Sequence, residues 1–451
     1  MTADQIRSAV AGAMPQAVED LKRLAAIPSI AFPGHPEEPV FAAAALTEEL
    51  LRSAGLPRVQ QVPVEGSFPA VYGEAPAPPG MPTVLLYAHY DVQPPGDPAA
   101  WRTPPFEPTL IDGRLYGRGC ADDKSGVISH VTALRAFQGR FPVGIKVIIE
   151  GQEEYAGERL EAFVERNPEL LRADAIVVAD TGNPRVGDPA VTTSLRGMAA
   201  FTIEVRTLRE AVHSGSFGGA APDALAALMR MLTSLHDDNG DVRVPGLPRG
   251  AFLGQGPSEE EFRKTAGVAD GVSLVGSGSL ADRLWSSYAI TVTGLDVPTV
   301  SGAVNAVQPV ARARVTLRVP PAGDPKTAVN AVVEFLRQVA PWGVQVSFGD
   351  FTVGSGFQAD SGGKARAALN RAMELGFGRP PRDVGAGGSI PLVSTLLKQF
   401  PAAEILLFGA EDEDAGIHAP NERVDLEELR RVATTEALFL HELSLPSALG
   451  V

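Results

Sequence analysis

The segment Thr83–Asp91 has the sequence TVLLYAHYD and joins a predicted strand to two chemically active side chains. Its first part, Thr83–Ala88, is a short apolar run between turn signals, which predicts a buried strand. His89 and Asp91 follow at the end of this strand, where open α/β sheets usually bind their ligands. A histidine with a carboxylate two residues later suits a metal ligand and the outer carboxylate that fixes its tautomer; a histidine in a turn would look the same.

Similar apolar runs recur along the chain and alternate with segments of helical periodicity. The further strand-like runs are Lys146–Ile149, Ala175–Ala179 and Ile405–Phe408, and helices are predicted at Phe41–Gly55, Lys124–Phe137, Gly363–Leu375 and Leu426–Leu443. Strands that alternate with helices indicate a layered α/β domain.

A different pattern occupies residues 193–355. Four strand-like segments and two helices follow one another in the order β-α-β-β-α-β, which is that of the ferredoxin-like unit. They are Met198–Val205, Ala221–Leu235, Tyr288–Val292, Ala313–Val319, Lys326–Val339 and Val344–Phe348. We therefore predict an α/β fold: a layered domain in two parts, residues 1–192 and 356–451, and an inserted ferredoxin-like domain over residues 193–355.

The composition of the chain limits the kinds of binding partner and the cellular compartment that we expect. The 451 residues contain 39 Lys and Arg against 54 Asp and Glu, a net charge of −15, which disfavours nucleic acid because phosphate binding needs a basic face. No apolar run approaches the roughly 18–20 residues that span a bilayer, and we expect no signal peptide. The single cysteine, Cys120, fits a reducing compartment. We expect a cytoplasmic protein with neither nucleic acid nor a membrane as its partner.

Acidic and histidine side chains also follow the other predicted strands of the layered domain. Glu150–Glu154, with three acids in five residues, comes after one strand, Asp180 ends another, and His418 closes an acidic loop after the last. Asp122 and Asp123 lie in a glycine-bearing loop before a helix. Any one of these could be a helix cap or a solvated turn.

Five of these side chains together suit a pair of divalent metal ions. The set has two imidazoles and three carboxylates: His89, Asp122, Glu154, Asp180 and His418. It could hold two cations that share one carboxylate, with Zn²⁺ the first choice and Mn²⁺ or Co²⁺ as alternatives. A free carboxylate beside a ligand carboxylate within Glu150–Glu154 would be the arrangement that hydrolytic metal sites use for a general base.

Seven segments resemble, in order, those of the co-catalytic dinuclear metallopeptidases, a family that includes carnosinase-like dipeptidases, aminoacylase, acetylornithine deacetylase, succinyl-diaminopimelate desuccinylase and glutamate carboxypeptidase. The segments are Tyr87–Pro94, Gly117–Gly126, Glu153-Glu154, Asp180, His213–Gly215, Gly387–Pro391 and His418–Glu422. The resemblance spans residues from about 80 to 422. It implies a zinc-peptidase catalytic domain, and it makes the inserted domain a lid and dimerisation domain.

The resemblance also implies a role for each side chain of the metal site. The five ligands would divide into a bridging carboxylate, Asp122, and two pairs, His89 with Asp180 and Glu154 with His418. Glu153 would be the general base that takes a proton from a water bridging the two metals. Asp91 would orient His89.

The resemblance also implies that the inserted domain takes part in substrate binding and in dimer assembly. His213 would reach the active site of a neighbouring subunit in a homodimer and stabilise the tetrahedral oxyanion. Arg318 would bind the carboxylate of the substrate, and Asn305 would act from the lid, although surface or turn roles fit both residues.

One segment departs from the carnosinase-like pattern. Those members usually carry an arginine and an acid before Gly-Gly-Ser, whereas this chain has Gly385 and Ala386 there. The missing guanidinium leaves carboxylate recognition to Arg318, Ser389 and backbone N–H groups.

The predicted function is metal-dependent hydrolysis of an amide bond in dipeptides or short peptides near a free carboxylate. An N-acyl amino acid deacylase is the alternative within the class, because both reactions begin with the same attack on an amide carbonyl. A non-catalytic peptide- or metal-binding protein could use the same scaffold, but Glu153 argues against it because such a protein needs no base beside its ligands.

Overall fold

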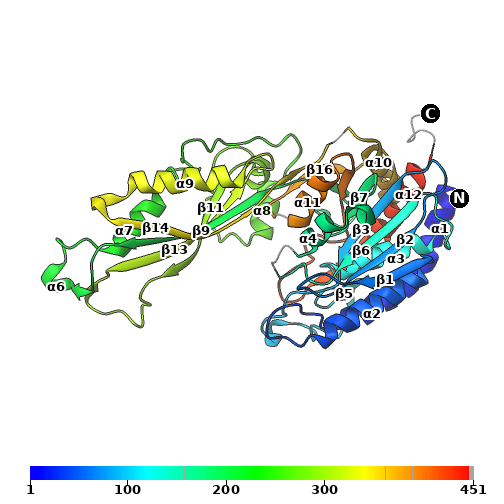
Figure 1. Ribbon diagram of the computed structural model, residues 1–451, viewed down its shortest axis with the longest axis horizontal. Helices are drawn as coiled ribbons and strands as arrows, with labels where there is room; N and C mark the ends of the chain where they lie inside the picture. The colour runs from blue at the N-terminus through cyan, green and yellow to red at the C-terminus, as the bar shows by residue number, and fades with distance from the viewer. Residues whose placement is uncertain (156–158, 361, 389, 446–451) are drawn as a thin grey trace. The chain divides into compact units, whose positions relative to one another are not determined.

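A computed structural model gives the arrangement of the chain and describes residues 1–155, 159–360, 362–388 and 390–445 (Figure 1). Its contacts divide the chain into two compact units. The first unit comprises Met1–Thr193, Ala359–Asp383 and Leu392–Val451, and the second comprises Ser194–Gln358 and Val384–Pro391. The chain passes between the units four times: within β8 (Ala190–Leu195), directly after β15 (Phe357–Gln358), within β16 (Arg382–Ala386) and within α11 (Pro391–Gln399).

The first unit is built on a mixed sheet whose strands follow the order β1-β2-β6-β3-β7-β17-β8. The bounds of the first six are β1 (Arg58–Val62), β2 (Ala70–Ala75), β6 (Gly144–Glu150), β3 (Thr83–His89), β7 (Ala175–Val178) and β17 (Glu404–Leu407). The four neighbours β6, β3, β7 and β17 run parallel. Their residues are mostly buried valine, isoleucine and leucine, as expected for a parallel sheet that is covered on both faces. Their carboxyl ends therefore meet at one edge of the sheet.

Long helices complete the core of the first unit. They are α1 (Ala3–Ala25), α2 (Glu38–Ser53), α3 (Lys124–Arg135), α10 (Lys364–Phe377) and α12 (Leu426–Leu443). Helix α3 packs against β3, and α12 packs against α1, α3 and α10 (Figure 1). Helices α4 (Arg159–Arg166) and α5 (Pro168–Leu171) and a small sheet of β4 (Thr109–Ile111), β5 (Arg114–Tyr116) and β18 (Arg423–Asp425) complete the unit.

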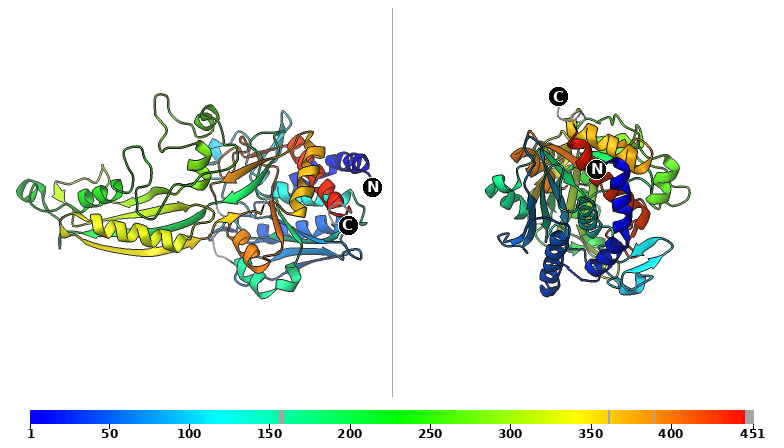
Figure 2. Two further views of the ribbon diagram at one scale, coloured as in Figure 1. Left: turned by 90° about the horizontal axis from the view of Figure 1, so that it is seen from above. Right: turned by 90° about the vertical axis from the view of Figure 1, so that its right-hand side faces the viewer.

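The second unit has a four-stranded antiparallel sheet in the order β11-β13-β9-β14. Its main elements in chain order are β9 (Gly197–Arg206), α7 (Ala224–Thr233), β11 (Ala289–Asp296), β13 (Val310–Val319), α9 (Pro325–Val339) and β14 (Gln345–Gly354). Helices α7 and α9 pack against each other and against the sheet (Figures 1 and 2). This β-α-β-β-α-β order confirms the predicted fold class, a layered α/β domain with an inserted ferredoxin-like unit.

The second unit also contains several short helices, turns and strands. They are β10 (Val212–His213), α6 (Ser214–Phe217), α8 (Glu259–Thr265), a π-helical turn (Asp282–Ser286), β12 (Ala306–Val307), a 3-10 turn (Pro341–Gly343) and β15 (Phe357–Gln358). Across the described ranges of both units, no helix is long and apolar enough to cross a membrane.

Candidate metal centre

The carboxyl edge of the parallel sheet gathers the acids and histidines of the first unit. β3 ends at His89, and the segment after β6 carries Glu153 and Glu154. Asp180 follows β7, and the loop after β17 leads to His418. Neighbouring parallel strands are about 4.8 Å apart, so side chains at their ends can reach a common centre.

Asp122 lies between the two histidines. Its Oδ1 is 3.0 Å from Nε2 of His89, and its Oδ2 is 3.0 Å from Nε2 of His418. The backbone N–H groups of Ala121 and Asp122 donate to Oε1 of Glu422 at 3.0 and 3.1 Å, which holds this loop in place. The two oxygens of one carboxylate thus face two separate imidazoles.

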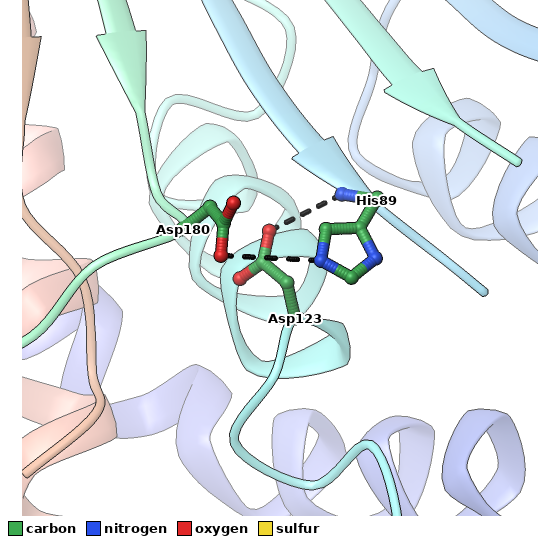
Figure 3. A group of neighbouring side chains, drawn as sticks. All are labelled: His89, Asp123 and Asp180. Atoms are coloured by element: carbon green, nitrogen blue, oxygen red, sulfur yellow. Dashed lines mark hydrogen bonds and ion pairs between the residues drawn. The ribbon is translucent and has the colours of Figure 1, made fainter. Parts of the chain in front are cut away.

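Asp123 and Asp180 complete the surroundings of His89 (Figure 3). Oδ1 of Asp180 is 3.9 Å from Nε2 of His89, and Oδ2 of Asp123 accepts a hydrogen bond from the backbone N–H of His89 at 3.2 Å. The peptide bond between Asp122 and Asp123 is cis. All three residues drawn in Figure 3 come from the sheet edge or from the loop before α3.

Glu154 completes the surroundings of His418. Its Oε2 is 3.1 Å from Nε2 of His418 and accepts a hydrogen bond from Nε2 of Gln93 at 2.8 Å. His418 has a φ of 58°, in the left-handed region that residues other than glycine rarely adopt. Residues with such a backbone conformation are found most often at functional sites, where the surrounding structure holds them in place.

Asp91 links His89 to the loop that carries Glu153 and Glu154. Its Oδ1 lies 3.3 Å from Nδ1 of His89. The same carboxylate accepts hydrogen bonds from the backbone N–H groups of Glu153, at 3.0 Å, and Glu154, at 3.1 Å. Asp91 is fully buried and connects the ends of β3 and β6.

Burial and neighbouring charges raise the pKa values of three groups in this centre, Glu153, Asp180 and His418. Burial raises the pKa of Glu153 to about 8, and the nearby carboxylates of Glu154 and Asp91 add to the rise. Burial also raises the pKa of Asp180 well above its usual range. Hydrogen bonds to Asp122 and Glu154 raise the pKa of His418 to about 10. A cation among these groups would favour the charged carboxylates and the neutral imidazoles.

The donor set fits two divalent metal ions. Three groups offer ligand atoms that lie within 4.8 Å of one another: His89, Asp123 and Asp180; Asp122, Glu154 and His418; and Asp122, Asp180 and Glu411. Asp123 is fully buried, and its Oδ1 has no hydrogen-bond partner in the described chain. Imidazole nitrogens and carboxylate oxygens are the usual ligands of Zn²⁺, Mn²⁺ and Co²⁺ in proteins.

Sequence reasoning missed several residues around this centre. Glu411 follows β17 within a run of acids, a pattern typical of a solvated loop. Gln93 and Glu422 lie within the segments Tyr87–Pro94 and His418–Glu422, but no sequence signal distinguishes their side chains as part of the centre. Glu422 is fully buried, and its Oε2 pairs with Nη1 of Arg118 at 2.6 Å.

The structure places His213 and Asn305 close together in the second unit. His213 is exposed, and its Nδ1 accepts hydrogen bonds from the backbone N–H groups of Gly215, at 3.1 Å, and Ser216, at 3.3 Å. The backbone carbonyl of Asn305 accepts from the N–H of Ser214 at 2.9 Å. Ser389, the third residue predicted to bind substrate, lies outside the described residues.

Arg318 has a second arginine beside it that sequence reasoning did not identify. Arg196 is 8% exposed, and burial together with the charge of Arg318 lowers its pKa to about 10. Its Nε has no hydrogen-bond partner within the described ranges. A β-carbon at Gly387 would lie only 3.1 Å from Nη2 of Arg196, so glycine leaves room for this guanidinium. Two neighbouring guanidinium groups suit an anionic ligand.

A carboxylate between two histidines, with further acids around it and two adjacent glutamates beside it, is the arrangement expected at the metal centre of a metal-dependent hydrolase.

Comparison with known proteins agrees with this class. The sequence matches the Peptidase family M20/M25/M40 over residues 85–442. It is 44% identical over 366 residues to a cysteinylglycine-S-conjugate dipeptidase of Corynebacterium striatum, covering 80% of each chain. It is 28% identical to a Beta-Ala-His dipeptidase of Rattus norvegicus over 95% of this chain and 92% of that protein. Among solved structures, human carnosine dipeptidase 1 aligns with a TM-score of 0.80 at 26% identity, covering 98% of this chain and 99% of its own.

The chain therefore belongs to the peptidase family M20/M25/M40. It is a hydrolytic enzyme, a metallopeptidase that uses divalent metal ions, which confirms the predicted family and enzyme class.

Proposed function

We propose that this enzyme hydrolyses the amide bond of dipeptides or short peptides that end in a free carboxylate, using two divalent metal ions. The observation that carries the proposal is the position of Asp122, whose two oxygens face His89 and His418, 3.0 Å from each. Two of the relatives act on dipeptides according to their names, a cysteinylglycine-S-conjugate dipeptidase and a Beta-Ala-His dipeptidase.

The five predicted ligands would hold the metals in two overlapping sets. Asp122 would be shared, with His89 and Asp180 on one side and Glu154 and His418 on the other. When bound, the two ions polarise the amide carbonyl and lower the pKa of the attacking water. Zn²⁺ is our first choice, and Mn²⁺ and Co²⁺ are the alternatives.

Glu153 would move the proton. It is half-buried next to the proposed ligand Glu154, and its backbone N–H donates to Asp91, which fixes its place. Its carboxylate takes a proton from the attacking water and gives it to the amine that leaves when the C–N bond breaks. The raised pKa matches this use, because a base with a pKa near the working pH can both accept and release the proton.

Residues of the second unit would bind the substrate. Arg318 and Arg196 would bind its carboxylate, together with Ser389. Asn305 would act from the lid that the second unit forms. His213 would stabilise the oxyanion in the active site of a partner, which requires a homodimer assembled through the second unit.

We further propose that the enzyme works in the cytoplasm without a nucleic acid or membrane partner. The single cysteine and the net charge of −15 support this location and this lack of partners.

A substrate panel tests the proposed reaction against deacylation. Chelated enzyme is reloaded with Zn²⁺, Mn²⁺ or Co²⁺ and offered dipeptides, the same dipeptides with a C-terminal amide, and N-acyl amino acids. We expect the free dipeptides to give the highest kcat/KM. Faster turnover of N-acyl amino acids would favour the deacylase, and no turnover of any compound would favour a binding protein.

The variant Glu153→Gln tests the assignment of the base. Because the amide cannot accept the proton, we expect kcat to fall by about 10²- to 10⁴-fold while two metal ions per subunit remain bound. The matched control is Glu165→Gln, at an exposed position of α4. Kinetics and elemental analysis measure the two quantities, and unchanged turnover in Glu153→Gln would refute the assignment.

A further inference from the structure

Glu411 is a carboxylate of the metal centre that none of the recognised motifs includes. One of its oxygens lies within 4.8 Å of ligand oxygens of both Asp122 and Asp180. We propose that Glu411 is an additional oxygen ligand of the metal ion held by His89 and Asp180, and that it shifts the selectivity of this position from Zn²⁺ toward Mn²⁺. This inference rests on the two-metal centre proposed above.

The backbone holds Glu411 at this position. Its carbonyl oxygen accepts a hydrogen bond from the N–H of Asn183 at 2.8 Å, and Gly182 and Glu411 form a parallel β-bridge. A β-carbon at Gly182 would overlap the backbone of Glu411, so only glycine allows the two segments to come this close. Asp180 lies two residues before Gly182, so the same contact keeps Glu411 and Asp180 together.

The carboxylates around Glu411 would be stabilised by a bound cation. Within the described ranges, the ion pairs of Asp122 and Asp180 are with histidines, and neither Glu411 nor Asp123 forms an ion pair. Asp123 is fully buried with one oxygen unpartnered. The carboxylates of Asp122, Asp123, Asp180 and Glu411 repel one another unless protons or a divalent ion offset their charge.

The type of ligand atom at a site determines which metal ion binds there more tightly. Asp180 belongs to two groups of side chains that could hold a metal, one with His89 and Asp123 and one with Asp122 and Glu411. A metal ion at this position would therefore be offered one imidazole and carboxylate oxygens from Asp122, Asp180 and Glu411. Mn²⁺ accepts more oxygen ligands than Zn²⁺, which is most often four-coordinate. The other position, with His418, Glu154 and Asp122, lacks this extra oxygen among the three residues that meet there.

The test compares Glu411→Gln with Glu413→Gln in the full-length protein. Glu413 is an exposed glutamate two residues further on, so the two variants share the chemical change but not the position. Mn²⁺ and Zn²⁺ binding are measured by calorimetry, Mn²⁺ also by electron paramagnetic resonance, and the Tm is recorded with metal and with EDTA. Glu411→Asp, which keeps the carboxylate, serves as the rescue variant.

We expect Glu411→Gln to weaken Mn²⁺ binding at one of the two positions by about tenfold or more, and Zn²⁺ binding by less. Its Tm in EDTA should equal or exceed that of the wild type, because one of several crowded acids is gone. Glu411→Asp should recover part of the affinity. A Mn²⁺ isotherm of Glu411→Gln identical to that of Glu413→Gln would overturn the inference, and so would a lower Tm in EDTA, which would assign Glu411 a structural role. Fewer than two ions bound by the wild type would instead contradict the two-metal centre itself.

Discussion

Asp122 stays ionised in surroundings where other acids hold their protons. Burial alone would raise its pKa, but hydrogen bonds from His418 and His89 bring the pKa below its usual range. At Glu153 and Asp180 the favourable interactions of the charged form do not offset the effect of burial, so the pKa of each is raised. Before metal binds, the centre is therefore a mixture of charged and protonated ligands.

Metal loading should release protons at neutral pH. In the metal-free protein, His418 with a pKa of about 10 and Glu153 with a pKa of about 8 are both protonated at pH 7. A divalent ion displaces the proton of His418 and disfavours that of Glu153, so protons leave and the apparent metal affinity rises with pH toward this range.

Titration calorimetry in buffers of different ionisation enthalpy measures this release directly. We expect a positive number of protons released at pH 7 and a smaller number at pH 9, where Glu153 has already lost its proton. Metal binding that releases no protons at pH 7 would contradict this account of the centre.

The convergence of the candidate ligands could be predicted from sequence because four of them follow apolar strands, while Asp122 lies in a loop before a helix. The structure brings the side chains of His89, Asp122, Asp180, Glu154 and His418 together. Glu411 and Arg196 could not be predicted in this way. Glu411 lies among acids that resemble a solvated loop, and Arg196 follows a strand whose residues give no sign of a buried guanidinium whose Nε lacks a partner in the described part of the chain.

At the level of elements, the carboxyl ends of β3, β6, β7 and β17 position the site. The loop after β17 lies against the segment after β7 through the bridge between Gly182 and Glu411 and the hydrogen bond from Asn183. The position of two acids therefore depends on one glycine that lies outside every recognised motif.

Replacement of this glycine should separate the two segments. We expect Gly182→Ala to lower the free energy of unfolding by about 1–3 kcal/mol, because the added methyl group overlaps the backbone of Glu411. Metal affinity should fall with it. Denaturant unfolding and calorimetry measure the two effects.

The matched control is Gly12→Ala in the middle of α1, where nothing lies within 4 Å of the added carbon. This change should raise stability by roughly 0.5–1 kcal/mol, since alanine is the better helix former. Equal effects of the two substitutions would show that Gly182 has no special role in packing.

Local sequence patterns predicted the presence of the long helices and strands better than the residues at which they begin and end. The parallel strands β3, β6, β7 and β17 are continuous apolar runs with clear ends. β2 was not predicted because its residues AVYGEA neither alternate nor form a continuous apolar run. Helical spacing in the sequence predicts a helix over Pro15–Ile27, yet α1 begins at Ala3, where Thr2 and Gln5 form a capping box.

At the level of the whole chain, the division into two units depends on contacts between distant segments. The second unit takes in Val384–Pro391 as well as Ser194–Gln358. The backbone N–H of Arg196 donates to the carbonyl of Ala386, which ties this returning segment to the unit. No local pattern in the sequence encodes such a contact.

The proposed role of His213 across a dimer can be tested by complementation. His213→Ala and Glu153→Gln should each be nearly inactive alone. If His213 serves the partner's active site, a mixed dimer has one intact site with Glu153 from one subunit and His213 from the other. Unfolding and refolding an equal mixture should then restore about a quarter of the wild-type activity, because half of the dimers are mixed and each has one working site.

Sedimentation establishes the oligomeric state in the same samples. A mixture no more active than its components would place His213 in its own subunit's site or outside the active site. An active enzyme that sediments only as a monomer would contradict the role across the dimer.

The position of β17 has a consequence for synthesis on the ribosome. This strand lies between β7 and β8 in the sheet, yet it is made more than two hundred residues after them. The uninterrupted stretch Ser194–Gln358 can fold as it emerges, whereas a gap stays open in the sheet of the first unit until the chain is nearly complete. The nascent polypeptide thus leaves the exit tunnel with most of its second unit complete and its candidate metal centre still missing a histidine.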